Sequence, residues 1–345
     1  MWLISLRDLQ WRRRRFIIAV AATGLVFGIT LLLSGMNSSF HNEIDRTVGS
    51  FHASAWVVPH QAAGPFTSSA AFPASVVRQV AAQPGVRRAD PMVVTRVTLP
   101  GANPKDLYVF GTAIGGIAPQ ATSGHNPTRS GEMVADTSLG KDVGSTLSVG
   151  GRQFRVVGTY DGRTVFAGQP TAVISIQDAR DISFDGEPLA TSVVTDGFPR
   201  SVPAGFKAQT ANEAAGDLRR PLKSATGTIG FLNVLLWIIA AGIIGSIVYL
   251  TVIERTRDFA VLKATGFASF SLFLSLAAEA VVIALASAVV AIVFAVALHG
   301  TLPMRVETSL GAYAALIVVA VVVGIVASLV GLRRAVGVDP ALAFG

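Results

Sequence analysis

The sequence contains no cysteine, and only 14% of its 345 residues carry a charged side chain. Without cysteine, disulfide bonds and cysteine-based metal or redox centres are excluded. A soluble protein normally has about a quarter of its residues charged, so the shortage of charge indicates another class. Charged residues are scarcest in four apolar segments, one at Phe16–Gly35 and three between Ile229 and Leu332.

The motifs of several enzyme classes are also missing. The five histidines form no His-Glu-x-x-His zinc motif, and the chain has no Gly-x-Ser-x-Gly elbow and no Gly-x4-Gly-Lys-Ser/Thr phosphate loop. His52 and His60 are interpreted as solvated surface residues rather than as a metal pair. The sequence therefore predicts a chain with no catalytic residues, no metal and no cofactor of its own, which does not hydrolyse ATP.

The four apolar segments are predicted to be membrane-spanning helices. Each is about 20 residues or longer, enough for a helix to cross about 30 Å of hydrocarbon. A buried core helix would be shorter and would show a polar stripe. The first segment is interpreted as an uncleaved anchor rather than a signal peptide, because no Ala-x-Ala cleavage site follows it.

The basic residues set the predicted topology. The net charge is +7 and the pI is near 10.2, but the bases lie beside the apolar segments, which argues against nucleic-acid binding. The clusters are Arg7 with Arg12–Arg15, Arg255 with Arg257 and Lys263, and Arg333 with Arg334. By the positive-inside rule these clusters are cytoplasmic. Both termini are therefore predicted on the cytoplasmic side of a bacterial inner membrane.

The predicted fold is an α-helical membrane protein with four spans, arranged as one and then three, and a large extracytoplasmic α+β domain between the first and the second. The predicted segments are a cytoplasmic N-terminus (1–15), span one (16–35), the extracytoplasmic domain (36–228), span two (229–253), a cytoplasmic loop (254–269), span three (270–298), a short outer loop (299–310), span four (311–332) and a cytoplasmic tail (333–345).

Within the extracytoplasmic domain, strand-like and helix-like stretches alternate. Gly150-Gly151 between two strand-like stretches predicts a two-residue hairpin turn. A Gly/Pro/Ser-rich break at Gly115–Ser130 allows two subdomains. Strands are expected at Ser54–Val58, Met92–Leu99, Leu107–Thr112, Gly131–Asp136, Thr146–Val149, Gln153–Tyr160, Thr171–Ile176 and Thr191–Thr195, and helices or helical turns at Pro73–Gln83, Ser138–Val143 and Gln177–Ile182.

Both ends of this domain have helical patterns. Phe40, Ile44 and Val48 recur every four residues after span one, so that helix is predicted to continue to Val48. Ala211–Thr228 has helical spacing before span two, and Pro221 is a candidate kink. The two helices are interpreted as a stalk that ties the spans to the domain. Ordinary linker helices are the alternative.

One ionisable residue falls deep in a predicted span. Glu279 lies about nine residues into span three, or about 14 Å along the helix axis. A carboxylate at that depth must be paired, protonated or facing water, and Thr23 and Ser246 are candidate partners by depth. A helix-packing polar contact is favoured over a substrate or proton site.

Two glycines in span one have the spacing of a helix-packing motif. Gly24 and Gly28 form a Gly-x-x-x-Gly pair, which allows a second helix to approach closely. This second helix could belong to another copy of the chain or to the same chain.

The loop Glu254–Gly266 carries the strongest local signal. Its pattern predicts a short amphipathic helix that ends at a glycine suited to a C-terminal cap. Because it joins two spans closely, it is well placed to receive force from a cytoplasmic partner. An interfacial helix resting on lipid is the alternative.

These residues resemble the FtsX-like permease family, which includes the MacB, LolC/LolE and DevC-type permease subunits of ABC transporters. The loop has the form E-R-T-R-x-x-x-V-L-K-A-x-G of that family's signature, and Glu279 matches a family glutamate early in the third span. The other matching segments are Leu6-Arg7-Asp8-Leu9, Gly131–Gly158, Arg333-Arg334-Ala335 and Asp339-Pro340-Ala341-Leu342. The departures are Phe267-Ala268-Ser269 and the spacer Val336–Val338.

The resemblance implies a type VII ABC transporter-like permease that dimerises and binds two copies of a separate ATPase subunit. ATP and Mg would be bound by that ATPase, and an extracytoplasmic adaptor or lipoprotein is a further expected partner. The loop would act as the coupling helix, through Glu254, Arg255, Arg257, Phe259, Leu262, Lys263 and Gly266.

The function predicted on this basis is to couple ATP hydrolysis by the partner to movement of the extracytoplasmic domain, for export, extraction or signalling. The alternatives are an ABC importer permease for a small solute and a membrane-anchored receptor that needs no ATPase. No residue pattern indicates the substrate.

Overall fold

A computed structural model describes residues 13–68, 70–101, 104–264, 269–298 and 310–336. The chain divides into two compact units. The helical unit contains residues 1–39 and 225–345, and the external unit contains residues 40–224. Predictions for Arg7, Arg12, Gly266, most of the outer loop 299–310 and the tail residues 337–345 lie outside the described residues.

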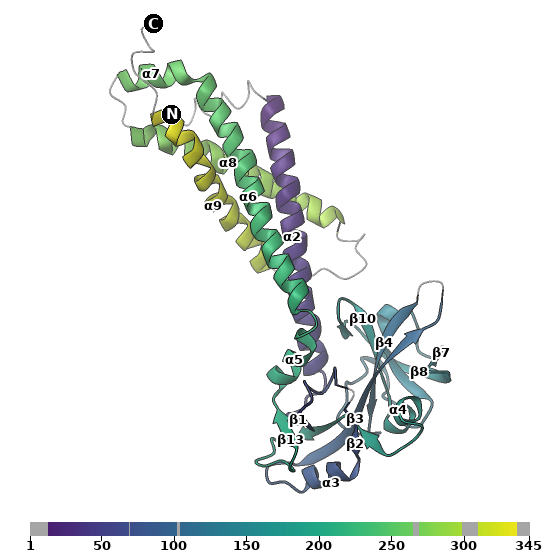
Figure 1. Cartoon of the computed structure of the whole chain (residues 1–345). Coiled ribbons are helices and arrows are strands. Elements are labelled where there is room, and N and C mark those ends of the chain that lie inside the picture. The colour runs from purple at the N-terminus through teal and green to yellow at the C-terminus, as the bar shows by residue number, and fades with distance from the viewer. Residues whose placement is uncertain (1–12, 69, 102–103, 265–268, 299–309, 337–345) are drawn as a thin grey trace. The chain divides into compact units, whose positions relative to one another are not determined.

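The helical unit is built from long apolar helices. They are α2 (Arg13–Gly49), α6 (Lys223–Glu254), α8 (Ser269–Leu298) and α9 (Leu310–Val336), and the short helix α7 (Thr256–Ala264) stands between α6 and α8 (Figure 1). Among the described residues, these four long helices have the length and composition to cross a membrane. The order of one helix, a large insertion and three helices is the order that the sequence predicts.

Small residues form the centre of the helical unit. Along α8 the buried positions include Ala280, Ala284, Ala288 and Ala291, and α9 contributes Ala320 to the same cluster. Alanine at a spacing of three or four residues lines one face of a helix and lets its neighbour approach closely. Larger apolar side chains on the opposite face of α8 are exposed, as expected of a helix that is apolar all round.

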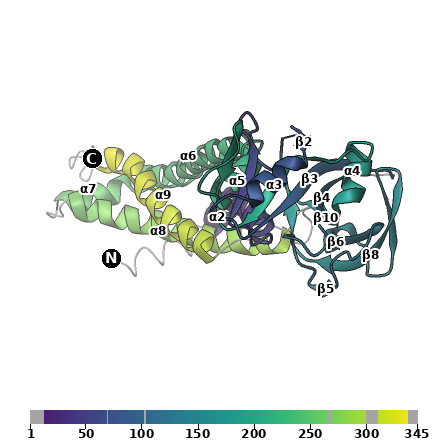
Figure 2. The same ribbon diagram turned by 90° about the horizontal axis from the view of Figure 1, so that it is seen from below.

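The external unit is centred on one large mixed sheet. Its strands follow the order β13-β1-β12-β3-β4-β10-β6-β8-β5, and the pairs β4–β10 and β6–β8 are parallel (Figure 2). The strands are β1 (Ala55–Pro59), β3 (Arg88–Leu99), β4 (Lys105–Thr112), β5 (Ser123–Gly124), β6 (Glu132–Asp136), β7 (Thr146–Val149), β8 (Arg152–Tyr160), β9 (Thr164–Val165), β10 (Gln169–Ser175), β12 (Ser192–Asp196) and β13 (Phe206–Gln209), while β2 (Phe72–Pro73) and β11 (Leu189–Ala190) form a separate pair.

The sheet is buried on both faces because successive side chains of a strand point to opposite sides. On β10, Val173 belongs to one apolar cluster, and its neighbours Ala172 and Ile174 belong to another. Helix α4 (Ile176–Ser183) covers the second cluster with Ala179, and α3 (Ser75–Ala81) packs on a third cluster near β1 and β12.

The hairpin between β7 and β8 turns at Gly150 and Gly151. Their φ angles are 57° and 78°, the left-handed values that a two-residue hairpin of this kind requires and that glycine adopts without strain. Glycine at both positions therefore specifies the turn and fixes the register of the two strands.

The helix before span two differs from its prediction. A single kinked helix is expected over Ala211–Thr228, but the structure has α5 (Ala211–Arg219), a turn at 220–222, and then α6. Thr210 and Glu213 form a capping box at the start of α5. Pro221 has no N–H to continue the ladder, so the helix is interrupted rather than bent.

Candidate functional site

The predicted coupling segment contains helix α7, which follows α6 after a tight corner. The Arg255 N–H donates to the Thr251 carbonyl at 3.1 Å, and the Thr256 hydroxyl donates to the Ile253 carbonyl at 2.7 Å. These bonds satisfy groups that the end of a helix leaves without an intrahelical partner. Within the helical unit, α7 lies at the end of the bundle where α2 begins and α6 ends (Figure 1).

An ion pair joins the first span to this corner. Arg15 Nη1 lies 2.6 Å from Glu254 Oε1, and the two side chains remain 47% and 31% exposed. A half-exposed pair contributes at most about 1 kcal/mol, so its main effect is to hold the start of α2 beside the end of α6. Glu254 belongs to the predicted coupling set, whereas its partner Arg15 was not predicted.

One face of α7 is open in this chain. Arg257, Asp258 and Val261 are exposed, and their spacing of one, three and four residues places them on one side of the helix. Ala260 is fully buried, and Arg255 is mostly covered, with its Nε 3.8 Å from Asp258 Oδ2. The side chains of Phe259, Leu262 and Lys263 and all of Gly266 lie outside the described residues, so their roles stay predictions.

Glu279 lies on α8 next to the buried Ala280. It is half-buried and is not isolated, since it has an interaction partner. The predicted partner Thr23 is wrong, because its hydroxyl is buried without any hydrogen bond. Ser246 donates its hydroxyl to the Gly242 carbonyl at 2.7 Å, one turn earlier in α6.

The two glycines of span one face another helix of the same chain. A Cβ at Gly24 would lie 2.8 Å from Val290 Cγ1, and a Cβ at Gly28 would lie 2.6 Å from Phe294 Cδ1. Both distances are too short for real Cβ contacts. Of the two helices that the sequence leaves open, the structure therefore places α8 of the same chain against this face.

The end of α2 in the external unit is fastened to a loop of the sheet. The Thr47 hydroxyl donates to the Thr164 carbonyl at 2.9 Å. Glu43 is buried beside the Thr164 side chain and the backbone of Ala167 and Gly168, and this burial raises the pKa of its carboxyl group above its ordinary value. These residues were not predicted, because their partners lie more than a hundred residues away in the sequence.

Helix α5 is fastened in the same manner. Asp217 is buried, and one of its oxygens accepts the N–H groups of Phe66 and Thr67 at 2.9 Å each, while the Thr67 hydroxyl donates to the other. Arg219 forms an ion pair with Asp45 of α2. Helices α2 and α5 are thus each fixed to a loop of the external unit and are joined to each other by this ion pair.

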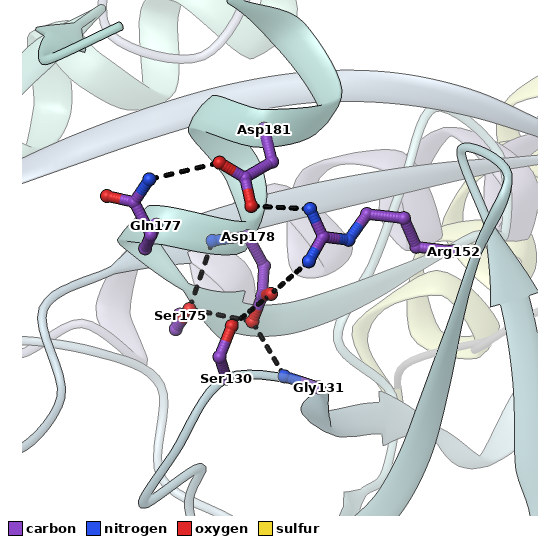
Figure 3. Close-up of polar contacts among 7 residues, drawn as sticks. All are labelled: Ser130, Gly131, Arg152, Ser175, Gln177, Asp178 and Asp181. Carbon is purple, nitrogen blue, oxygen red and sulfur yellow. Dashed lines mark hydrogen bonds and ion pairs between the residues drawn. The ribbon is translucent and has the colours of Figure 1, made fainter. Parts of the chain in front are cut away.

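Another buried carboxylate, that of Asp178, joins α4 to strand β8 and to the turn before β6 (Figure 3). Asp178 of α4 is fully buried and accepts from the Ser130 hydroxyl, from the Gly131 N–H at 3.0 Å and from the Ser175 hydroxyl at 2.7 Å. Arg152 of β8 lies 3.6 Å from it and pairs with the more exposed Asp181. Every bond is internal, so the cluster holds the fold together.

Glu132 stabilises the neighbouring turn. It accepts from the Thr128 N–H and hydroxyl and from Arg129 Nε, each at 2.9 Å. The backbone bond from Thr128 is the largest cause that lowers the pKa of Glu132 to about 2. No three His, Cys, Asp or Glu side chains converge on a metal-sized site within the part of the chain that the structure describes.

Comparison with known proteins defines the class. Residues 17–213 match the MacB-like periplasmic core domain, and residues 230–340 match the FtsX-like permease C-terminal domain. An uncharacterized ABC transporter permease of Mycobacterium tuberculosis (strain ATCC 25618 / H37Rv) is 42% identical over 100% of this chain and 99% of its own length. Another from Mycobacterium bovis (strain ATCC BAA-935 / AF2122/97) is 41% identical with the same coverage.

Two solved structures are also similar. The periplasmic region of MacB from Actinobacillus actinomycetemcomitans has a TM-score of 0.35 at 12% identity, with 49% of this chain and 93% of that chain covered. The extracellular domain of the noncanonic ABC-type transporter YknZ from Gram-positive bacteria has a TM-score of 0.33 at 11% identity, with 46% and 99% covered.

The chain is an integral inner-membrane protein with four apolar helices and a MacB-like extracytoplasmic domain. It belongs to the MacB/FtsX-type ABC transporter permeases. Membership in this family confirms the fold class, the membrane location and the prediction of an ABC transporter permease, and it implies a partner ATPase subunit. Permease subunits of ABC transporters are generally non-catalytic.

Proposed function

We propose that this permease subunit transmits motion driven by ATP hydrolysis on a separate ATPase to its own extracytoplasmic domain. The proposal rests on helix α7. This helix lies between two spans, and its exposed face presents Arg257, Asp258 and Val261. A short rigid helix at this position moves with α6 and α8. The Arg15–Glu254 pair joins the same corner to α2, so a push on α7 would reach span one as well.

The anchors of the external unit support the same role. Helix α2 is continuous from Arg13 to Gly49, and its last turns carry Thr47, which bonds to the Thr164 carbonyl, and Glu43, which is buried beside the loop at 164–168. A helix that moves is useful for transmission only if its far end is fixed to the part that must respond. The buried bonds of Thr47 and Asp217 provide that fixation.

The nucleotide chemistry is assigned to the partner. The sequence has no phosphate loop, so ATP and Mg belong to the ATPase subunit, and this chain acts without a catalytic residue, metal or cofactor. Two ATPase copies would serve two permease copies. An extracytoplasmic adaptor or lipoprotein is the further partner expected for export, extraction or signalling.

The second permease copy is proposed to dock on α6. This helix is the least buried of the four spans. Gly242 has no atom within 4 Å of a Cβ built on it, and Ser246, one turn later, is exposed. Small residues four apart on an outward face suit close packing against a neighbouring helix, whereas Gly24 and Gly28 already face α8.

The proposal is tested by placing a charge in α7. With the full chain and its ATPase in lipid nanodiscs, we expect Phe259→Asp or Leu262→Asp to uncouple ATP hydrolysis from transport or signalling, since a carboxylate would disrupt an apolar contact with the ATPase. The protein should still insert. The readouts are the ATPase rate, the amount of ATPase that co-purifies and the functional output.

Val143→Asp is the matched control, because Val143 is 48% exposed in the external unit and also gains a carboxylate. It should leave coupling unchanged. If ATP hydrolysis stays coupled to the functional output in both α7 variants, this helix does not receive the movement driven by the ATPase.

A further inference from the structure

A cavity of about 580 Å³ opens in the external unit between β3, β4, the loop at 166–169 and the residues that precede α6. Its volume falls in the range of sites that hold small organic ligands, about 300–1,000 Å³. Phe66 and Thr67 also bond to Asp217, which fixes α5, but the open space itself has no part in the coupling role described above.

Aromatic rings form its walls. Tyr108 and Phe166 stand with ring centroids 5.2 Å apart at an interplanar angle of 53°. Phe66 is 2% exposed and packs edge-on against Phe110 at 5.9 Å. Leu222, just before α6, closes another side. A planar apolar body would meet ring faces and edges here, the geometry in which aromatic groups attract one another.

The position of Phe166 is specified by a strained turn. Phe166 and Ala167 have φ angles of 48° and 70°, and Gly168 follows with 89°. Left-handed backbone is unfavourable for residues with a Cβ and persists only where the surroundings enforce it. The turn follows Thr164, whose carbonyl accepts from the Thr47 hydroxyl of α2 at 2.9 Å, and the buried carboxyl group of Glu43 lies beside Ala167 and Gly168. The end of α2 thus holds one wall of the cavity in place.

A charged side chain also lines the cavity. Arg96 is the one charged residue in the described lining, and its side chain is 56% exposed. Asp106 pairs with its Nη2, and since a guanidinium has five N–H donors, others stay available to a ligand oxyanion.

We propose that this cavity binds an amphipathic aromatic anion. The aromatic body lies between Phe66, Phe166 and Leu222, and its carboxylate is held by Arg96, whose planar fork matches a carboxylate. Such a ligand contacts both the loop fastened to α2 and the segment that leads into α6. The proposal concerns binding alone and stands whether or not the coupling role of α7 is correct.

The test uses the full chain in lipid nanodiscs and isothermal titration calorimetry with 2-naphthoate. We expect saturable binding of 2-naphthoate above the signal of empty nanodiscs. The cation 2-naphthylmethylammonium has a similar body, and it should bind at least about tenfold more weakly because Arg96 repels it. Equal binding of the two probes, or no binding of 2-naphthoate, would overturn the proposal.

Two variants of one ion pair separate ligand binding from structure. Arg96→Gln should weaken 2-naphthoate binding at least about tenfold, since a charge-assisted bond is lost. Asp106→Asn breaks the same ion pair but frees Arg96, so binding should stay equal or become tighter. If both variants weaken binding to the same degree, the ion pair acts only on the fold and the site assignment is wrong.

Discussion

Two carboxylates three residues apart on α4 illustrate how burial decides what a residue does. Asp178 is fully buried and accepts bonds from Ser130, Gly131 and Ser175, whereas the side chain of Asp181 is 25% exposed. Removing a buried acceptor leaves its donors without partners, which costs about 1–3 kcal/mol for each group. Removing an exposed ion-pair partner costs at most about 1 kcal/mol.

We therefore expect Asp178→Ala to destabilise the external unit by about 3 kcal/mol or more and Asp181→Ala to cost less than about 1 kcal/mol. Hydrogen–deuterium exchange over residues 130–183 of the full chain measures the difference as faster exchange in the first variant. Equal exchange in the two variants would show that the bonds of Asp178 do not hold this side of the sheet together.

The residue scale is also where sequence reasoning reaches its limit. Glu254 could be assigned to a site from its motif, but its partner Arg15 is 239 positions away. Asp217 and the backbone of Phe66 are 151 positions apart. A pattern of polar residues contains no information on such pairs until the fold brings them together. The cavity near Arg96 was missed for the same reason.

At the scale of elements, periodicity predicted most of the structure. A short apolar run marks β10, which extends over Gln169–Ser175 against an expected Thr171–Ile176, and Gly150-Gly151 specifies the β7–β8 hairpin. Strands of two residues such as β2 and β5 are too short to show any period. The break before α6 was expected as a kink, because sequence alone does not say whether a proline bends a helix or ends it.

The packing of α8 against α9 gives a test at this scale. A Cβ at Gly324 would lie 3.0 Å from Val281 Cα and 3.1 Å from the Ala280 carbonyl oxygen, both backbone atoms. Gly324→Val should force the two helices apart and cost about 1–3 kcal/mol. The thermal unfolding midpoint of the detergent-solubilised chain measures this loss.

Gly230→Val is the control for that experiment, because no atom lies within 4 Å of a Cβ at Gly230. It should leave the unfolding midpoint within a degree or so of the parent protein. A loss of similar size in both variants would mean that valine itself, rather than the α8–α9 contact, causes the destabilisation.

At the scale of the whole molecule, the proposed docking of a second permease copy on α6 can be tested directly. Because the chain has no native cysteine, one introduced thiol reports on one position. Ile238→Cys on the exposed side of α6 should form a disulfide-linked dimer in oxidised membranes, since a disulfide needs Cα atoms about 4.4–6.8 Å apart.

Ala240→Cys serves as its control, because Ala240 is fully buried within the chain whereas Ile238 is 63% exposed. It should remain monomeric on a non-reducing gel. A dimer band for Ala240→Cys, or none for Ile238→Cys, would place the contact elsewhere than on the outward side of α6.

Helices α2 and α6 enter the external unit in different ways. Helix α2 is an unbroken helix of 37 residues, about 55 Å long, and its end is fixed to the domain through Thr47. Helix α6 begins only after the turn at 220–222, and the helix fixed to the domain on that side is the separate α5. A rotation of the first span would therefore reach the domain along one continuous helix, whereas a rotation of the second span would have to pass through that turn.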